Sequence, residues 1–171
     1  CIRSGQHPYN TALIADYIAH HGPEETGKWL AGLRDNLARK AAGGDREGAK
    51  DILGGVCDIA VANSYYVGLM RSGKGGDEQK QWADAIKVLL PTFKDDGTHV
   101  NISGAAVAKH APNKEEAVKL LEYLVSDEAQ KIYAEANYEY PVKAGVAADP
   151  IIAELGELKI DSKPLTEIVA N

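Results

Sequence analysis

The 171-residue sequence predicts an α/β fold in which helices flank a mostly parallel sheet. Short apolar runs alternate with segments of helical periodicity, and the connections between them are brief. The run at 56–62 is apolar except for Asp58, as expected for a strand covered on both faces. With 44% hydrophobic and 26% charged residues, the composition is that of an ordinary globular domain.

Strands are predicted first at residues 1–4, and then at 56–62 and 86–90, the last one stopped by Pro91. Between the first two strands, Asn10 is expected to cap a helix that ends at Gly22, and Pro23 begins another helix. Asp45 is expected to cap a third helix at about 46–53.

The second half of the chain is expected to begin after a polar turn at 93–97, with a long extended segment at 99–108. Asn113 and Glu116 then suggest a capping box, and Ser126 is expected to cap the next helix, through about 136. Residues 138–142 are predicted to be extended, and Pro150 opens a final helix.

Charge and hydropathy exclude two classes of partner. No apolar run approaches the roughly 20 residues that a membrane-spanning helix needs. The net charge of -6, without a dense stripe of lysine and arginine, argues against a nucleic acid, since binding a phosphate backbone requires clustered cations. There is also no P-loop, no GxGxxG after a strand and no HExxH, so we expect no enzymatic activity.

The two cysteines each open a predicted strand, and a tyrosine follows each at the same distance. Tyr9 lies eight positions after Cys1, and Tyr65 lies eight positions after Cys57. If the two strands are parallel neighbours in register, the cysteines meet at one end and the tyrosines at the other. Either the cysteines form a disulfide, which indicates an oxidising compartment such as the periplasm, or they are buried free thiols.

Tyr65 and Tyr66 are adjacent at the end of a predicted strand, and Tyr9 precedes a helix in the same way. Phenolate oxygens suit a hard trivalent cation such as Fe³⁺, and such a cation favours the ionised phenolate strongly. Nearby helix N-termini stabilise the same charge. These three tyrosines are therefore candidate metal ligands; the alternative is that Tyr65 and Tyr66 are packing residues.

Four segments resemble the ferric-ion-binding periplasmic proteins of bacterial ABC iron importers: CIRSGQHPYN, ANSYYVGLM, GTHVNISGAAVAKHAPN and LEYLVSDEAQKIYAEANYEYPV. The resemblance implies the class II periplasmic-binding-protein fold, with two α/β lobes that close on Fe³⁺. It also implies Tyr9, Tyr65 and Tyr66 as metal ligands, a periplasmic location and an ABC transporter permease at the inner membrane as partner.

The same resemblance divides the chain and implies that it is a fragment. Residues 1–95 would form the second lobe, 96–146 the hinge crossover and part of the first lobe, and 147–171 the return to the second lobe. Most of the first lobe would be missing, because members of this family are about twice as long. The apolar helix faces of 96–146 would then need that N-terminal lobe, or another copy of the chain, to cover them.

Other interpretations stay open from the sequence alone. A binding protein of the same fold could carry another solute, such as a polyamine, thiamine or an oxyanion, and an interaction module without a ligand is a further alternative. Among the histidines, His20 and His21 are expected at the surface or near a helix C-terminus, and His7 in a solvated loop. His99 and His110 have no neighbouring residues at ligand spacing.

Overall fold

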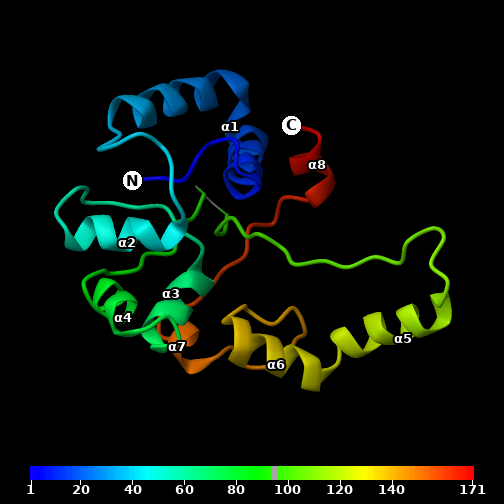
Figure 1. Cartoon of the computed structure of the whole chain (residues 1–171). Helices are drawn as coiled ribbons and strands as arrows, with labels where there is room; N and C mark the ends of the chain where they lie inside the picture. Colours follow the sequence, from blue (N-terminus) through cyan, green and yellow to red (C-terminus); the bar gives the residue numbers. More distant parts are fainter. Residues whose placement is uncertain (94–95) are drawn as a thin grey trace.

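The computed structural model describes residues 1–93 and 96–171. Within these ranges the chain forms helices joined by long extended segments (Figure 1). The helices are α1 (Pro8–Asp35), α2 (Asp45–Leu53), α3 (Ser64–Arg71), α4 (Asp77–Asp84), α5 (Lys114–Leu124), α6 (Asp127–Asn137), α7 (Pro150–Ala153) and α8 (Leu165–Val169). Across the same residues, none of the helices combines the length and the apolar character needed to cross a bilayer.

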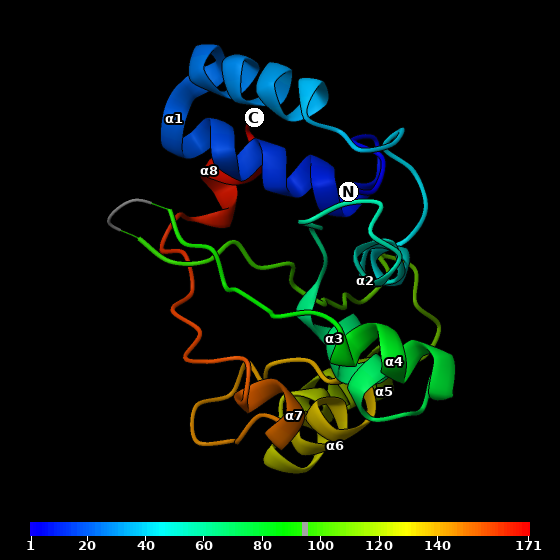
Figure 2. The same ribbon diagram turned by 90° about the vertical axis from the view of Figure 1, so that its left-hand side faces the viewer.

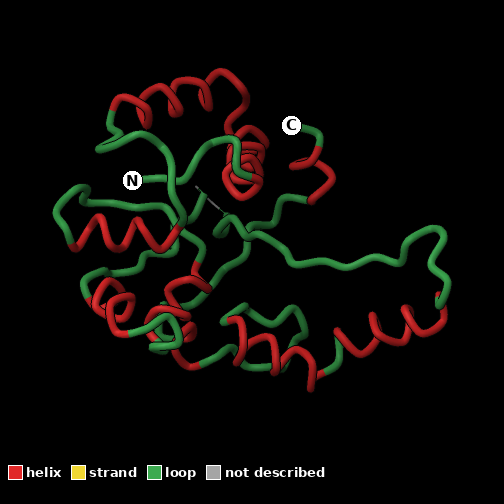
Figure 3. Tube along the Cα trace, viewed as in Figure 1, coloured by secondary structure: helices red, strands yellow, loops and turns green. Residues whose placement is uncertain are grey.

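The predicted strands are extended segments that pair only locally. No strand is present in the described residues, as the absence of yellow in Figure 3 shows, and the pairing there is one isolated parallel bridge between Thr98 and Ile160. The start of the chain lies beside the segment after α2, where the amide of Val61 donates to the carbonyl of Cys1 at 3.1 Å. This is the neighbourhood predicted for the first two strands, but the sheet itself stays a prediction.

Helix α1 consists of two arms that meet at Gly22, where φ is 77°. The two helices predicted on either side of this glycine are therefore confirmed. The predicted cap is wrong: His7 is the N-cap, and its Nδ1 accepts from the amide of Tyr9 at 3.3 Å. Asn10 lies inside the helix and is buried, and its amide donates to the carbonyls of Arg3 and Ser4.

A small apolar core joins α2, α3 and α4 (Figure 2). Its buried members are Ala49, Val67, Met70 and Ala83. Close packing continues from α3 to the end of α6, since a Cβ added at Gly68 would lie 2.5 Å from that of Tyr138. Helix α3 is thereby held on two sides, which fixes the direction of its first turn.

Two further predicted caps are corrected and one is confirmed. Gly44, not Asp45, is the N-cap of α2, because the Asp45 carboxylate accepts hydrogen bonds from residue 63 instead. Asn113 forms no side-chain cap for α5 among the described residues. Ser126 caps α6 as predicted, and its Oγ accepts from the amide of Ala129 at 3.2 Å.

Helix α5 extends away from the rest of the chain in Figure 1 and packs only at the α6 end. None of its residues is buried in the described structure. Leu120 is 56% exposed, and Val118 and Tyr123 are also largely open to solvent. The apolar face that the sequence predicts for this helix is therefore present and uncovered.

Candidate metal centre

The three candidate tyrosines lie in the first turns of two helices. Tyr9 is the second residue of α1, and Tyr65 and Tyr66 are the second and third residues of α3. Both helices begin directly after an extended segment, at residues 1–4 and 56–62. The tyrosines thus lie where an extended segment leads into a helix, although the strands predicted there are not formed in the described residues.

The structure brings these three side chains together. The rings of Tyr65 and Tyr66 lie with their centroids 4.5 Å apart. Burial raises the pKa of the Tyr65 phenol well above its usual range, and hydrogen bonds with Tyr9 and Tyr66 raise it further. Since both neighbours act on the Tyr65 hydroxyl, the three phenols lie close together.

Two arginines border this cluster, and sequence analysis did not single them out. The guanidinium of Arg3 lies 5.5 Å from the centroid of the Tyr9 ring, and that of Arg46 lies 5.9 Å from the Tyr66 ring. Burial lowers the pKa of Arg3, but a hydrogen bond with Tyr66 and the charge of Asp45 outweigh it, so the net shift is upward. A fixed cation beside the phenols favours their ionised form.

Asp45 connects the two segments that carry the tyrosines. One carboxylate oxygen pairs with Arg3 at 3.1 Å, and the other accepts from the amide nitrogen and the side chain of Asn63, at 2.8 and 2.9 Å. Asn63 also accepts a hydrogen bond from the side chain of Asn101 at 2.8 Å. Three extended segments therefore meet at this point, directly before the first turn of α3.

The two cysteines form a disulfide, Cys1–Cys57, across a sequence separation of 56 residues. This settles the alternative that the sequence left open, and the described residues contain no free cysteine. The disulfide lies at the start of the same two segments whose far ends carry Tyr9 and Tyr65. The two segments that carry the tyrosines are thus linked by the disulfide at one end and by the contacts of Asp45 at the other.

His7, His20 and His99 have partners that the sequence did not predict, whereas His21 is exposed as expected. His7 is the cap of α1, next to Tyr9, with a ring-centroid distance of 4.5 Å. His20 is not at the surface: its side chain is 10% exposed and its Nε2 lies 3.0 Å from Asp161. His99 meets Asp16 at 2.7 Å. The four-residue spacing of Asp16 and His20 was the one sequence signal for this second group.

The phenol cluster places three candidate oxygen ligands beside two helix N-termini, with the charges of Arg3, Arg46 and Asp45 nearby. Such a set binds a hard, highly charged cation once the phenols lose their protons.

The fold and this site define a class of protein. Residues 19–160 match the family of bacterial extracellular solute-binding proteins, and the chain belongs to that family. It is 44% identical over 163 residues to iron uptake protein A2 of Synechocystis sp., a match that covers 94% of this chain and 46% of that protein.

Solved structures agree with this assignment. A Bordetella ferric binding protein is 65% identical, with a TM-score of 0.92, and the match covers 99% of this chain and 54% of that one. A Mannheimia haemolytica ferric iron-binding protein A in an open conformation is 47% identical, with a TM-score of 0.93 and coverages of 100% and 53%. The chain therefore spans about half the length of the relatives that it matches.

Proposed function

We propose that this chain belongs to the iron(III)-binding periplasmic component of an ABC importer, with Tyr9, Tyr65 and Tyr66 as ligands of ferric iron. The convergence of three phenols at two helix N-termini carries this proposal. The relatives support it, because their names describe iron uptake and ferric binding. The protein would capture Fe³⁺ without catalysis and deliver it to the permease.

Charge supports iron over an organic solute. Three phenolates balance the charge of Fe³⁺, and oxygen ligands of this kind match a hard trivalent ion. The Arg3 guanidinium lies close enough to the phenols to stabilise their negative charge before the metal arrives.

We further propose that the chain adopts part of the class II periplasmic-binding-protein fold, whose extended segments complete a mostly parallel sheet in the whole protein. Residues 1–95 would form the second lobe, 96–146 the hinge crossover and part of the first lobe, and 147–171 the return. The uncovered apolar face of α5 supports this division, since it requires a covering partner. That partner would be the remaining N-terminal lobe, or a second copy of the chain.

A visible-absorption titration tests the iron site. A weakly chelated ferric salt is added to this chain and to the two-lobe protein, that is, the chain together with its proposed N-terminal lobe. Each is tested with and without the double substitution Tyr65→Phe and Tyr66→Phe. We expect a saturable phenolate-to-iron charge-transfer band in the two-lobe protein, which the double variant loses. Tyr133→Phe, on α6, is the matched control and keeps the band. If no band forms in either protein, the cargo is a different solute.

A further inference from the structure

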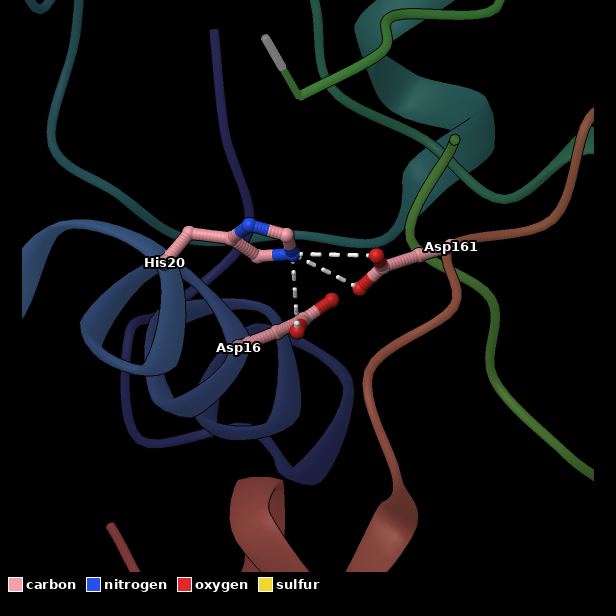
Figure 4. A group of neighbouring side chains, drawn as sticks. All are labelled: Asp16, His20 and Asp161. Atoms are coloured by element: carbon pink, nitrogen blue, oxygen red, sulfur yellow. Dashed lines mark hydrogen bonds and ion pairs between the residues drawn. The ribbon is translucent and has the colours of Figure 1, made fainter. Parts of the chain in front are cut away.

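A second group of potential ligands lies away from the tyrosines, on three separate parts of the chain. Asp16 and His20 are one turn apart on the first arm of α1, and Asp161 comes from the extended segment before α8 (Figure 4). One ligand atom from each residue lies within 4.8 Å of the others. Figure 4 shows both carboxylates directed at the imidazole of His20.

The distances suit a shared ion. His20 Nε2 lies 3.0 Å from Asp161 Oδ1 and 3.9 Å from Asp16 Oδ1. Nitrogen and oxygen ligands bind Zn²⁺ at about 2.0–2.2 Å, so neighbouring ligands of one ion are separated by roughly 3–4 Å. Small rotations of these side chains would therefore suffice to place a cation between them.

One oxygen of this group points into it without a partner. The Asp16 side chain is 1% exposed, and Oδ1 accepts no hydrogen bond from any residue that the structure describes. Its other oxygen, Oδ2, is held by Nδ1 of His99 at 2.7 Å. This arrangement leaves one lone-pair-bearing oxygen fixed, buried and directed at His20.

Burial makes the charge of the group costly unless a cation compensates it. The Asp161 side chain is 4% exposed and that of His20 is 10% exposed. Two carboxyl groups, those of Asp16 and Asp161, lie beside one imidazole in a region with little water, where negative charge is costly. A divalent cation would neutralise both and satisfy the free oxygen of Asp16.

We propose that Asp16, His20 and Asp161 form a binding site for a divalent transition-metal cation such as Zn²⁺. Oδ1 of Asp16, Nε2 of His20 and a carboxylate oxygen of Asp161 are the ligands. His99 is a positioning residue that orients Asp16, and Phe93 positions the His20 ring by stacking on it at 4.0 Å. The mixed nitrogen and carboxylate set is borderline in softness and differs in this respect from the all-phenol cluster.

This ion would join elements that are far apart in sequence. His20 and Asp161 are separated by 141 residues, and the segment that holds His99 also reaches Asn63 through Asn101. A bound cation would therefore tie α1 to the C-terminal segment at the place where the crossover segment passes. Its role would be structural, since it would hold these two parts of the chain together.

A Co²⁺ titration tests the site, because Co²⁺ replaces Zn²⁺ and shows visible d–d bands when protein ligands bind it. The experiment uses the two-lobe protein with Tyr9→Phe, Tyr65→Phe and Tyr66→Phe, so that none of the three phenols contributes to the spectrum. We expect saturable bands that Zn²⁺ displaces. The bands are lost in His20→Gln and in Asp161→Asn, whereas His21→Gln and Asp127→Asn, at exposed neighbouring and surface positions, keep them.

Thermal unfolding shows whether a variant has lost its metal site or its fold. Each variant is first melted without metal, and only those with a cooperative transition are compared for the rise in Tm that Zn²⁺ produces. His99→Phe should weaken Co²⁺ binding about 10–100-fold without abolishing it, as expected for a residue that only orients a ligand. Bands that persist in both His20→Gln and Asp161→Asn, or no bands and no Zn²⁺-dependent rise in Tm, would overturn the proposal.

Discussion

At the scale of single residues, Tyr65 combines burial with two neighbouring phenols. Burial raises its pKa first, and the hydrogen bonds with Tyr9 and Tyr66 add to the effect. The phenol is therefore protonated at neutral pH, and a metal ion must displace that proton before the oxygen can bind. If Tyr65 is an iron ligand as proposed, iron capture depends on pH.

We predict that ferric iron releases about one proton for each phenolate formed, so that Tyr65→Phe releases about one proton fewer. Because each displaced proton opposes binding more strongly at low pH, the affinity falls by about tenfold per phenolate for each pH unit lowered. Proton release is measured with a pH electrode in weakly buffered solution, on the two-lobe protein. Equal release by Tyr65→Phe and the unsubstituted protein would exclude Tyr65 as a ligand.

Asp45 acts on the site without being a candidate ligand. Its buried carboxylate holds Arg3, beside Tyr9, and Asn63, directly before α3. We predict that Asp45→Asn lowers the free energy of unfolding by about 1–3 kcal/mol, because it leaves buried donors without their acceptor. It should also weaken iron binding while the wavelength of the charge-transfer band stays unchanged, since the ligands remain.

Urea unfolding and the ferric titration check this prediction. The control is Asp127→Asn, which removes an exposed pair with Lys143 and should change stability by less than about 1 kcal/mol. An Asp45→Asn variant as stable as this control would show that Asp45 does not hold the two segments together.

At the scale of elements, Asp96 joins the start of the crossover segment to the C-terminal segment. Its carboxylate accepts from Oγ of Ser162 at 2.6 Å, from the Ser162 amide at 2.9 Å and from the Gly97 amide at 2.8 Å. The hydrogen bonds from Ser162 are the main reason that the pKa of Asp96 is lowered to about 2. The Thr98–Ile160 bridge lies directly beside this contact.

A lowered pKa means that the folded state favours the ionised carboxylate. The resulting stabilisation is complete above pH 3.8 and is lost as the pH falls toward about 2. We predict that Ser162→Ala moves the pKa of Asp96 toward its ordinary value and reduces this acid-dependent loss of stability. NMR titration of the carboxyl carbon and unfolding between pH 2 and 5 measure both effects. Ser72→Ala, whose Oγ donates to a backbone carbonyl, should leave the pH dependence unchanged.

The elements show which features a sequence can predict. The two arms of α1, the Ser126 cap and the position of the tyrosines at the starts of two helices follow from local spacing, and the structure agrees with each of them. The spacing of the cysteines left a disulfide and free thiols open, and the structure shows the disulfide. The Asn10 and Asp45 caps were wrong because these side chains bind backbone groups or partners outside their own helix turn. The burial of His20 depends on Asp161, 141 residues away, and no local pattern reports that contact.

At the scale of the whole molecule, the Cys1–Cys57 disulfide closes a large loop that contains α1 and α2. In the chain-entropy model, a loop of this size stabilises the folded state by about 4 kcal/mol. It also fixes the separation of the two segments that end at the tyrosines, so stability and the proposed iron affinity both depend on it.

We predict that Cys1→Ser with Cys57→Ser lowers the free energy of unfolding of the two-lobe protein by up to about 4 kcal/mol and weakens ferric binding. Urea denaturation and the charge-transfer titration measure the two effects. A reducing agent should act on the unsubstituted protein in the same direction and have no effect on the serine variant. Unchanged stability in that variant would show that folding does not depend on the disulfide.

The bend at Gly22 determines the shape of a large part of the molecule. A straight helix of 28 residues would be a rod about 42 Å long, in which Tyr17 and Trp29 would be about 18 Å apart. Instead, their rings stack with centroids 4.4 Å apart, so α1 doubles back on itself (Figure 2). The backbone at this position, with φ of 77°, is one that glycine adopts readily and other residues rarely do. Gly22 therefore turns what would be one long helix into two shorter helical arms that pack against each other.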